Sequence, residues 1–144
     1  MIWTRVRDER GSAAIEAAVG MPAFVLFIGL IIFGGRTATT HSAVESAAAE
    51  GSRTASIERT ASEAKRQAQT AATASLSNQD IHCLSTSVVI DVSDFGKPVG
   101  EAGSVTVTVE CLLDLADLSV PGVPGSRLIK ATSTSPLDTW RERG

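Results

Sequence analysis

The pattern of hydrophobic and polar positions divides the chain into three parts. The first is residues 17–35, an uncharged run of 19 residues whose centre, residues 23–33, is almost entirely apolar. A helix that crosses a bilayer needs about 20 mainly apolar residues, so the pattern predicts a transmembrane helix over residues 12–36. The chain has one such segment, which indicates a single-pass or cleaved secretory protein rather than a channel or transporter.

The second part, residues 37–77, is rich in Ala, Ser, Thr, Glu, Gln and Arg. Small residues recur every four positions and share one helical face: Ala43, Ala47, Gly51 and Ala55. We expect the membrane helix to continue through this part outside the bilayer. A stripe of small residues lets another backbone approach closely. We expect it to pack on a neighbouring helix in an assembly, on the chain's own sheet, or on each of them at different turns.

The third part, residues 78–136, predicts strands. The segment 88–92 is β-branched, residues 105–111 alternate valine with polar residues, and a last strand is expected around 127–133. Loops rich in Gly and Pro separate these segments. The sequence therefore predicts an α+β protein with a long N-terminal helix, a small antiparallel β head and a flexible tail over 137–144.

The two cysteines, Cys83 and Cys111, are predicted to be cross-strand neighbours. Each lies 14 residues from Lys97, so a hairpin that turns near Lys97 places them opposite one another. An exported head is an oxidising setting in which a disulfide persists. Two free buried thiols or a metal site with His82 are the alternatives, and zinc would need four ligands that the sequence does not supply.

Charge predicts the orientation of the chain. Arg5, Arg7 and Arg10 precede the apolar run, and only Arg36 follows it closely. Positively charged flanks stay in the cytoplasm, so we expect a cytoplasmic N-terminus and an exported C-terminal part in the plasma membrane. The alternative is an ordinary signal peptide, for which the apolar run is long and no Ala-x-Ala site follows. The net charge of −3 does not indicate nucleic-acid binding.

Glu16 stands directly before the apolar run. A carboxylate near the bilayer core costs about 2.5–3.5 kcal/mol on insertion scales, so a lone acid there predicts a function and a cationic partner. Gly11 precedes it by five residues, and this spacing before an apolar helix resembles the signal of type IV pilins and pseudopilins. A simpler alternative is that Glu16 reaches the lipid headgroups at the start of the helix.

The opening Arg10–Pro22 is more closely similar to that of the TadE family, the pilin-like proteins of tight-adherence (Tad/Flp) systems, whose openings commonly carry a proline where Pro22 stands. The stretch Ser46–Arg53 is similar to a stretch that follows the membrane helix in that family, and Ala131–Pro136 resembles the tail of actinobacterial members. The resemblance implies a type IV pilin-like fold. It also implies a membrane-bound prepilin peptidase that cuts after Gly11 and removes residues 1–11.

Such a cut would free the amine of Ser12, one helical turn from Glu16. In pilin assemblies this glutamate meets the N-terminal amine of its own or a neighbouring subunit. The resemblance therefore implies as partners the membrane, the prepilin peptidase, other pilin or pseudopilin subunits and the Tad assembly platform. The 133 residues left after the cut are too many for the short major pilin and fit a minor subunit. The ordinary alternative is a single-pass envelope protein whose exported β domain binds another partner.

The sequence shows no catalytic motif. It lacks a Gly-rich phosphate loop, a nucleophile elbow and a cluster of histidines with carboxylates, and it contains two histidines, His41 and His82. We expect no enzymatic activity, no cofactor, no small-molecule substrate and no metal. A calcium site that uses Asp114 and Asp117 is the one alternative.

Overall fold

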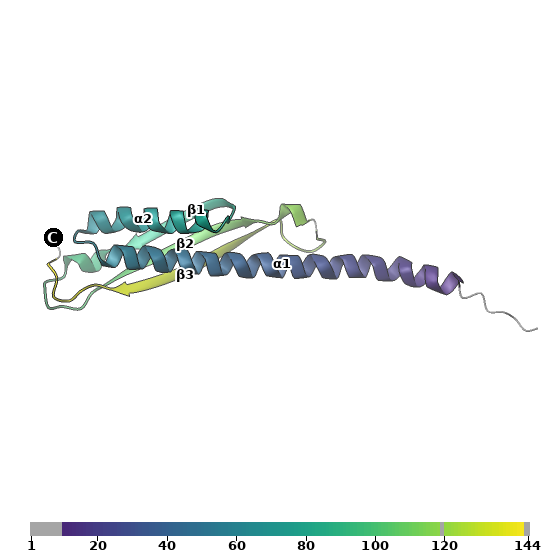
Figure 1. Ribbon diagram of the computed structural model, residues 1–144, viewed down its shortest axis with the longest axis horizontal. Helices are drawn as coiled ribbons and strands as arrows, with labels where there is room; N and C mark the ends of the chain where they lie inside the picture. The colour runs from purple at the N-terminus through teal and green to yellow at the C-terminus, as the bar shows by residue number, and fades with distance from the viewer. Residues whose placement is uncertain (1–9, 119, 143–144) are drawn as a thin grey trace, which may run out of the picture.

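The computed structural model describes residues 10–118 and 120–142 (Figure 1). Two helices, α1 (Arg10–Ser56) and α2 (Ala61–Asn78), precede three strands, β1 (Cys83–Asp91), β2 (Ser104–Asp114) and β3 (Ser126–Pro136). Two short 3-10 helices, η1 (Ser93–Gly96) and η2 (Ala116–Leu118), lie in the connections between strands. The second half of α1 and α2 lie along the sheet, while the first half of α1 projects alone.

The prediction of one helix running to residue 77 is wrong. α1 ends at Ser56, and α2 begins at Ala61 after a tight reversal in which the Glu58 amide donates to the carbonyl of Ala55. Thr60 sets the start of α2: its backbone is extended, and its hydroxyl accepts a hydrogen bond from the Glu63 amide at 3.2 Å. α2 then packs back against α1, and the two form a helical hairpin.

The three strands form one antiparallel sheet in the order β1-β2-β3. All three predicted strands are confirmed, and each is longer than expected. Within β2 the alternate residues Val105, Val107 and Val109 are fully buried, whereas the residues between them face away from the core. This alternation buries one face of the sheet under the two helices and leaves the other to solvent.

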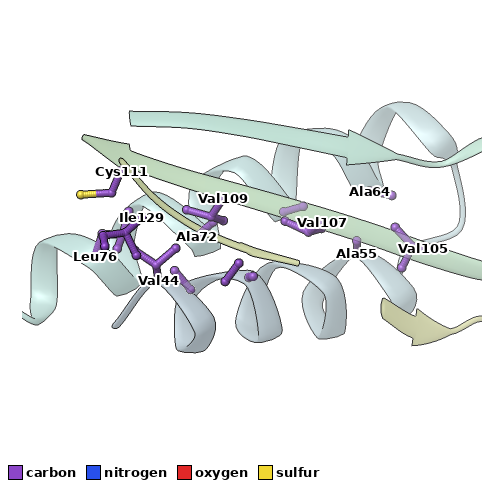
Figure 2. Close-up of a cluster of buried hydrophobic side chains, with 14 of the residues drawn as sticks. Val44, Ala55, Ala64, Ala72, Leu76, Val105, Val107, Val109, Cys111 and Ile129 are labelled. Carbon is purple, nitrogen blue, oxygen red and sulfur yellow. The ribbon is translucent and has the colours of Figure 1, made fainter. Parts of the chain in front are cut away.

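The core is built from small residues on the helices and branched residues on the sheet (Figure 2). Every member of the small-residue stripe of α1 is buried against α2 and the sheet: Ala43, Ala47, Gly51 and Ala55. The stripe therefore packs within the chain, which decides among the interpretations of the sequence. Ser52, also buried, shares hydrogen bonds with the hydroxyls of Ser133 and Ser135 at 3.1 and 2.9 Å.

The segment after β3, predicted to be a flexible tail, makes defined contacts over its described residues. Leu137 is 6% exposed, and its amide donates to the carbonyl of Gly103. The Arg141 guanidinium donates to the carbonyl of Ile57 at 2.7 Å, so Arg141 is attached to the reversal between α1 and α2. Trp140 is 81% exposed and takes no part in the core.

Candidate functional site

The predicted processing and assembly residues all lie on the projecting half of α1. This helix begins at Arg10, so Gly11 and Ser12 belong to its first turn. If a protease binds the chain around Gly11 in an extended form, the first turn of α1 must therefore unwind. The first turn contains no acidic residue to stabilise the helix N-terminus, which keeps that unwinding inexpensive. Residues 1–9, with Arg5 and Arg7 of the predicted leader, lie outside the described residues.

Glu16 is exposed and has no ion-pair partner among the side chains of residues 14–118 and 120–142. It follows Ser12 by four residues, which places the two positions on one face of the helix, one turn apart. If the chain were cut before Ser12, the new ammonium would lie within one turn of the carboxylate. Glu16 would then also stand near the positive end of the shortened helix.

Pro22 lies inside α1, which continues through it without interruption. Proline has no N–H, so the carbonyl of Ala18, four residues earlier, receives no helical hydrogen bond from this position. The helix is therefore weakened one turn and a half beyond Glu16. The neighbouring glycines of the apolar run, Gly20 and Gly34, have no heavy atom within 4 Å of an added Cβ, so this part of the helix is unpacked on those faces.

The projecting half of α1 exposes large apolar side chains on all sides. Eleven large hydrophobic residues between Ile15 and Ile32 are exposed, among them Met21 at 71% and Phe24 at 64%. Among the described residues, one helix is long and apolar enough to cross a membrane by its length and composition, and it is this one. A helix that is hydrophobic all round requires an apolar environment, consistent with the predicted membrane anchor.

An ion pair marks the point where α1 meets the head. The Arg36 guanidinium donates to both carboxylate oxygens of Asp117 at 2.8 Å. The two residues are 81 positions apart, so no sequence pattern could have paired them. They border an open cleft of about 500 Å³, lined by Arg36, Thr39, Thr40, Asp80, Ile81, His82, Leu113, Asp114 and Asp117.

The disulfide between Cys83 and Cys111 is confirmed, with its Cα atoms 5.4 Å apart. The predicted register is wrong, however, because Cys111 lies opposite Thr86 and Cys83 lies opposite Leu113. An irregularity between Cys83 and Ser85 leaves Leu84 unpaired. In a regular ladder Cys83 would face away from the core. The extra residue of this bulge turns Cys83 to the core side, where it reaches Cys111 diagonally.

No metal centre is evident in the part of the chain that the structure describes, where no three His, Cys, Asp or Glu residues are grouped to hold an ion. Cys83, beside His82, is held in the disulfide. Of the residues considered for calcium, Asp114 accepts a hydrogen bond from the Ala116 amide, and Asp117 is engaged by Arg36.

Among the described residues, the titratable groups with a shifted pKa lie on α2 and around the connection between β1 and β2. The pKa of Asp94 is lowered, first by a hydrogen bond from Lys97 and then by one from the Ser104 amide. The pKa of Asp91 is lowered mainly by the Ser93 amide. On α2, Arg66 and then Gln67 lower the pKa of Glu63, which in turn raises that of Arg66. These pairs fasten turns and a helix surface, and they do not form a catalytic cluster.

The long apolar N-terminal helix, the second helix and the three-stranded antiparallel sheet make this an α+β protein with a pilin-like fold. The model of the family described as TadE-like protein matches residues 11–53. The match begins at Gly11 and includes Glu16 and Pro22, so the resemblance to that family is confirmed for this part of the chain. No curated protein and no solved structure matched the sequence.

Proposed function

We propose that this chain is a minor pilin or pseudopilin of a Tad/Flp pilus system. A prepilin peptidase removes residues 1–11, the apolar part of α1 holds the subunit in the plasma membrane, and the head lies on the extracytoplasmic side. From the membrane the subunit enters the pilus, or primes its assembly, through contacts with other subunits and the Tad assembly platform. The proposal gives the protein a structural role without catalysis or cofactor.

The observation that carries this proposal is the position of the family match. It covers the proposed cleavage position, the acid and the whole apolar run. Val120 packs on this run at Gly29, and eleven large hydrophobic residues between Ile15 and Ile32 remain exposed. A helix with exposed apolar residues on all sides fits lipid before assembly and neighbouring helices after it. Glu16 is suited to be the one polar contact in that packing, because a buried carboxylate requires a paired cation.

The processing step is tested by the N-terminal sequence of the protein isolated from membranes. In a host that has the prepilin peptidase, we expect the chain to begin at Ser12. In a host that lacks it, and in a Gly11→Val variant, we expect the residues before Ser12 to remain. A chain that keeps these residues while pili form normally would overturn the proposal. Such a result would favour a single-pass envelope protein whose β domain binds another partner.

The role of Glu16 is tested by Glu16→Ala against a matched control, Glu45→Ala. Glu45 is an exposed glutamate on the same helix, and its ion-pair contact is with His41 one turn away. We expect both variants to enter the membrane, because removing a charge favours insertion. Only Glu16→Ala should lower the number of pili, counted by electron microscopy. Equal piliation in the two variants would leave Glu16 with an interfacial role alone.

A further inference from the structure

A second apolar element lies beside the projecting helix. The connection between β2 and β3 contains the segment Val120–Pro124, called here the Val–Pro loop. Val120 packs so closely on α1 that a Cβ atom added to Gly29 would lie 2.7 Å from its Cγ2. Gly29 stands within the uncharged run of α1, seven residues before Arg36. The head therefore reaches back along the part of the helix that is apolar enough to be in lipid.

The apolar part of α1 and the Val–Pro loop are both free of charged residues, and together they form one uncharged region. Arg36 is the first charged residue after the apolar run, and Asp117 is the last one before the Val–Pro loop. The two form an ion pair, so both uncharged segments end at the same level of the molecule. At 1.5 Å per residue, Gly29 lies about 10 Å along the helix axis from Arg36. The headgroup layer on one side of a bilayer is roughly 5–7 Å thick.

The backbone of the Val–Pro loop is poor in hydrogen-bond donors. Pro121 and Gly122, whose φ is +84°, occupy the central positions of a turn closed by the Val123 amide and the Val120 carbonyl at 3.1 Å. Pro121 and Pro124 have no N–H. Because unsatisfied backbone groups are costly in a medium with little water, this composition suits the boundary between headgroups and hydrocarbon.

We propose that the Val–Pro loop is a second membrane contact, seated at the boundary between headgroups and hydrocarbon in the extracytoplasmic leaflet beside α1. This inference rests on the proposed insertion of α1 in the membrane. With the helix and the loop both in lipid and the Arg36–Asp117 pair at the surface, the head cannot rotate freely about the junction. The occupant of this surface is lipid rather than a second copy of the chain.

The test uses the full chain in nanodiscs of phosphatidylcholine and phosphatidylglycerol, loaded at one chain per disc. Trp3 and Trp140 are replaced by Phe, and single tryptophans are introduced by Val123→Trp, Val99→Trp and Ile31→Trp. Val99 is the matched control, because it is an exposed valine in another Pro- and Gly-containing loop, between η1 and β2. Ile31, exposed on the apolar half of α1, reports whether the helix is in lipid.

We expect brominated lipid to quench the tryptophans at 123 and 31, and iodide to quench the one at 99 several-fold more strongly than the one at 123. Quenching at 31 by lipid but at 123 by iodide alone would overturn the loop contact and leave the proposed function standing. No lipid quenching at 31 would overturn both. Protection at 123 that appears only with several chains per disc would show that a second copy covers the loop, which also overturns the proposal.

The fold of each variant is checked by the absence of free thiols, which reports the Cys83–Cys111 bond. If Val123→Trp fails this check, Pro124→Trp takes its place, because Pro124 is exposed and lies outside the central positions of the turn. The same outcomes then apply to position 124.

Discussion

Gly51 of α1 is packed closely against both α2 and the sheet. A Cβ added there would lie 3.2 Å from Val107 Cγ1 and 3.3 Å from the carbonyl oxygen of Ala68. The second neighbour is backbone and cannot rotate away. A larger side chain at this position therefore separates α1 from α2 or from β2.

We predict that Gly51→Leu lowers the free energy of unfolding by about 1–3 kcal/mol, the usual range for overpacking a core. The control is Gly34→Leu on the same helix, where an added Cβ meets nothing within 4 Å. Both changes give the same gain in helix propensity. The difference between the unfolding free energies of the two variants therefore reports the cost of overpacking at Gly51. Denaturant unfolding of the two proteins in the same detergent measures it, and equal stabilities would contradict the packing described for Gly51.

Asp94 makes the stability of the turn between β1 and β2 dependent on pH. Its carboxylate is bonded to Lys97 and to the Ser104 amide, both at 2.9 Å, which holds its pKa below the usual value. A lowered pKa in the folded state stabilises the fold above the unfolded pKa. That stabilisation is lost as pH falls below about 4 and through the folded pKa.

We therefore predict that Asp94→Asn has a lower melting temperature than the wild type at pH 7. As the pH falls from 5 to 2, the difference between the two melting temperatures should become smaller. Thermal scans monitored by circular dichroism at several pH values measure this. Asp138→Asn is the control, because Asp138 is an exposed aspartate after β3 and accepts a hydrogen bond from the Trp140 amide two residues further on. A difference between Asp94→Asn and wild type that does not change with pH would contradict the assignment.

At the scale of the elements, the start of α2 depends on Thr60. We predict that Thr60→Ala destabilises the head by about 0.5–2 kcal/mol, the range for loss of an N-cap hydroxyl. The control is Thr70→Ala, in which the lost hydroxyl bonds only to the carbonyl of Arg66 within the same helix. Urea unfolding distinguishes the two, and a Thr60→Ala variant as stable as Thr70→Ala would show that the cap does not set the reversal.

The disulfide is the covalent tie between β1 and β2. With a sequence separation of 28, its loss should cost about 3.6 kcal/mol in the chain-entropy model. We predict this loss of unfolding free energy for the double change Cys83→Ala and Cys111→Ala, measured by denaturant unfolding against the oxidised wild type. Addition of a reductant should lower the stability of the wild type alone. A wild type that is insensitive to reductant would contradict the prediction.

The sequence predicted the sheet better than the helices. The alternation of valines in β2 was sufficient to find its buried face, because one side of that strand is packed and the other is in water. The break before α2 was also encoded, since Thr60-Ala61-Ser62-Glu63 follows the capping-box pattern. The helical composition on both sides of the break obscured it, because composition reports propensity and not where a helix turns back.

The register was missed because residue count alone does not fix a hairpin. A 3-10 helix and the bond from the Ser104 amide to Asp94 occupy the connection between β1 and β2, and they shift the pairing by three positions from the predicted one. The bulge at Leu84 then restores the meeting of the two cysteines. The expected ladder had the wrong register and lacked the bulge. Because these two errors offset one another at Cys83, the disulfide prediction was still correct.

At the scale of the whole molecule, the apolar half of α1 contributes little to the core. Among residues 14–118 and 120–142, the buried core residues lie at Thr40 or beyond, and Phe33 packs against them while partly buried. We predict that the chain from Arg36 onward folds as a soluble monomer with its disulfide intact. Sedimentation velocity and thermal unfolding measure this, with the full chain in detergent as the reference. Aggregation of the shortened chain, or free thiols in it, would contradict an independent core.

Some features of the candidate site could be predicted from the sequence, and others could not. Gly11, Glu16 and Pro22 could be found from sequence because they form a local pattern on one segment. The contacts of Arg36 with Asp117 and of Gly29 with Val120 could not, because they join residues that only the folded head brings together. The partner proposed for Glu16 is an amine that processing creates or another subunit supplies, so a single unprocessed chain does not contain it.

The hydrogen bond from Arg141 to the carbonyl of Ile57 fixes the last described residues at the tip of the head, opposite the projecting half of α1 (Figure 1). If α1 is in the membrane as proposed, anything fused after this point would be carried away from the lipid surface and from the helix proposed for assembly. The proposed topology therefore makes this end a place to display a peptide or a fluorescent reporter on the cell surface. Labelling there would count copies of the subunit on intact cells.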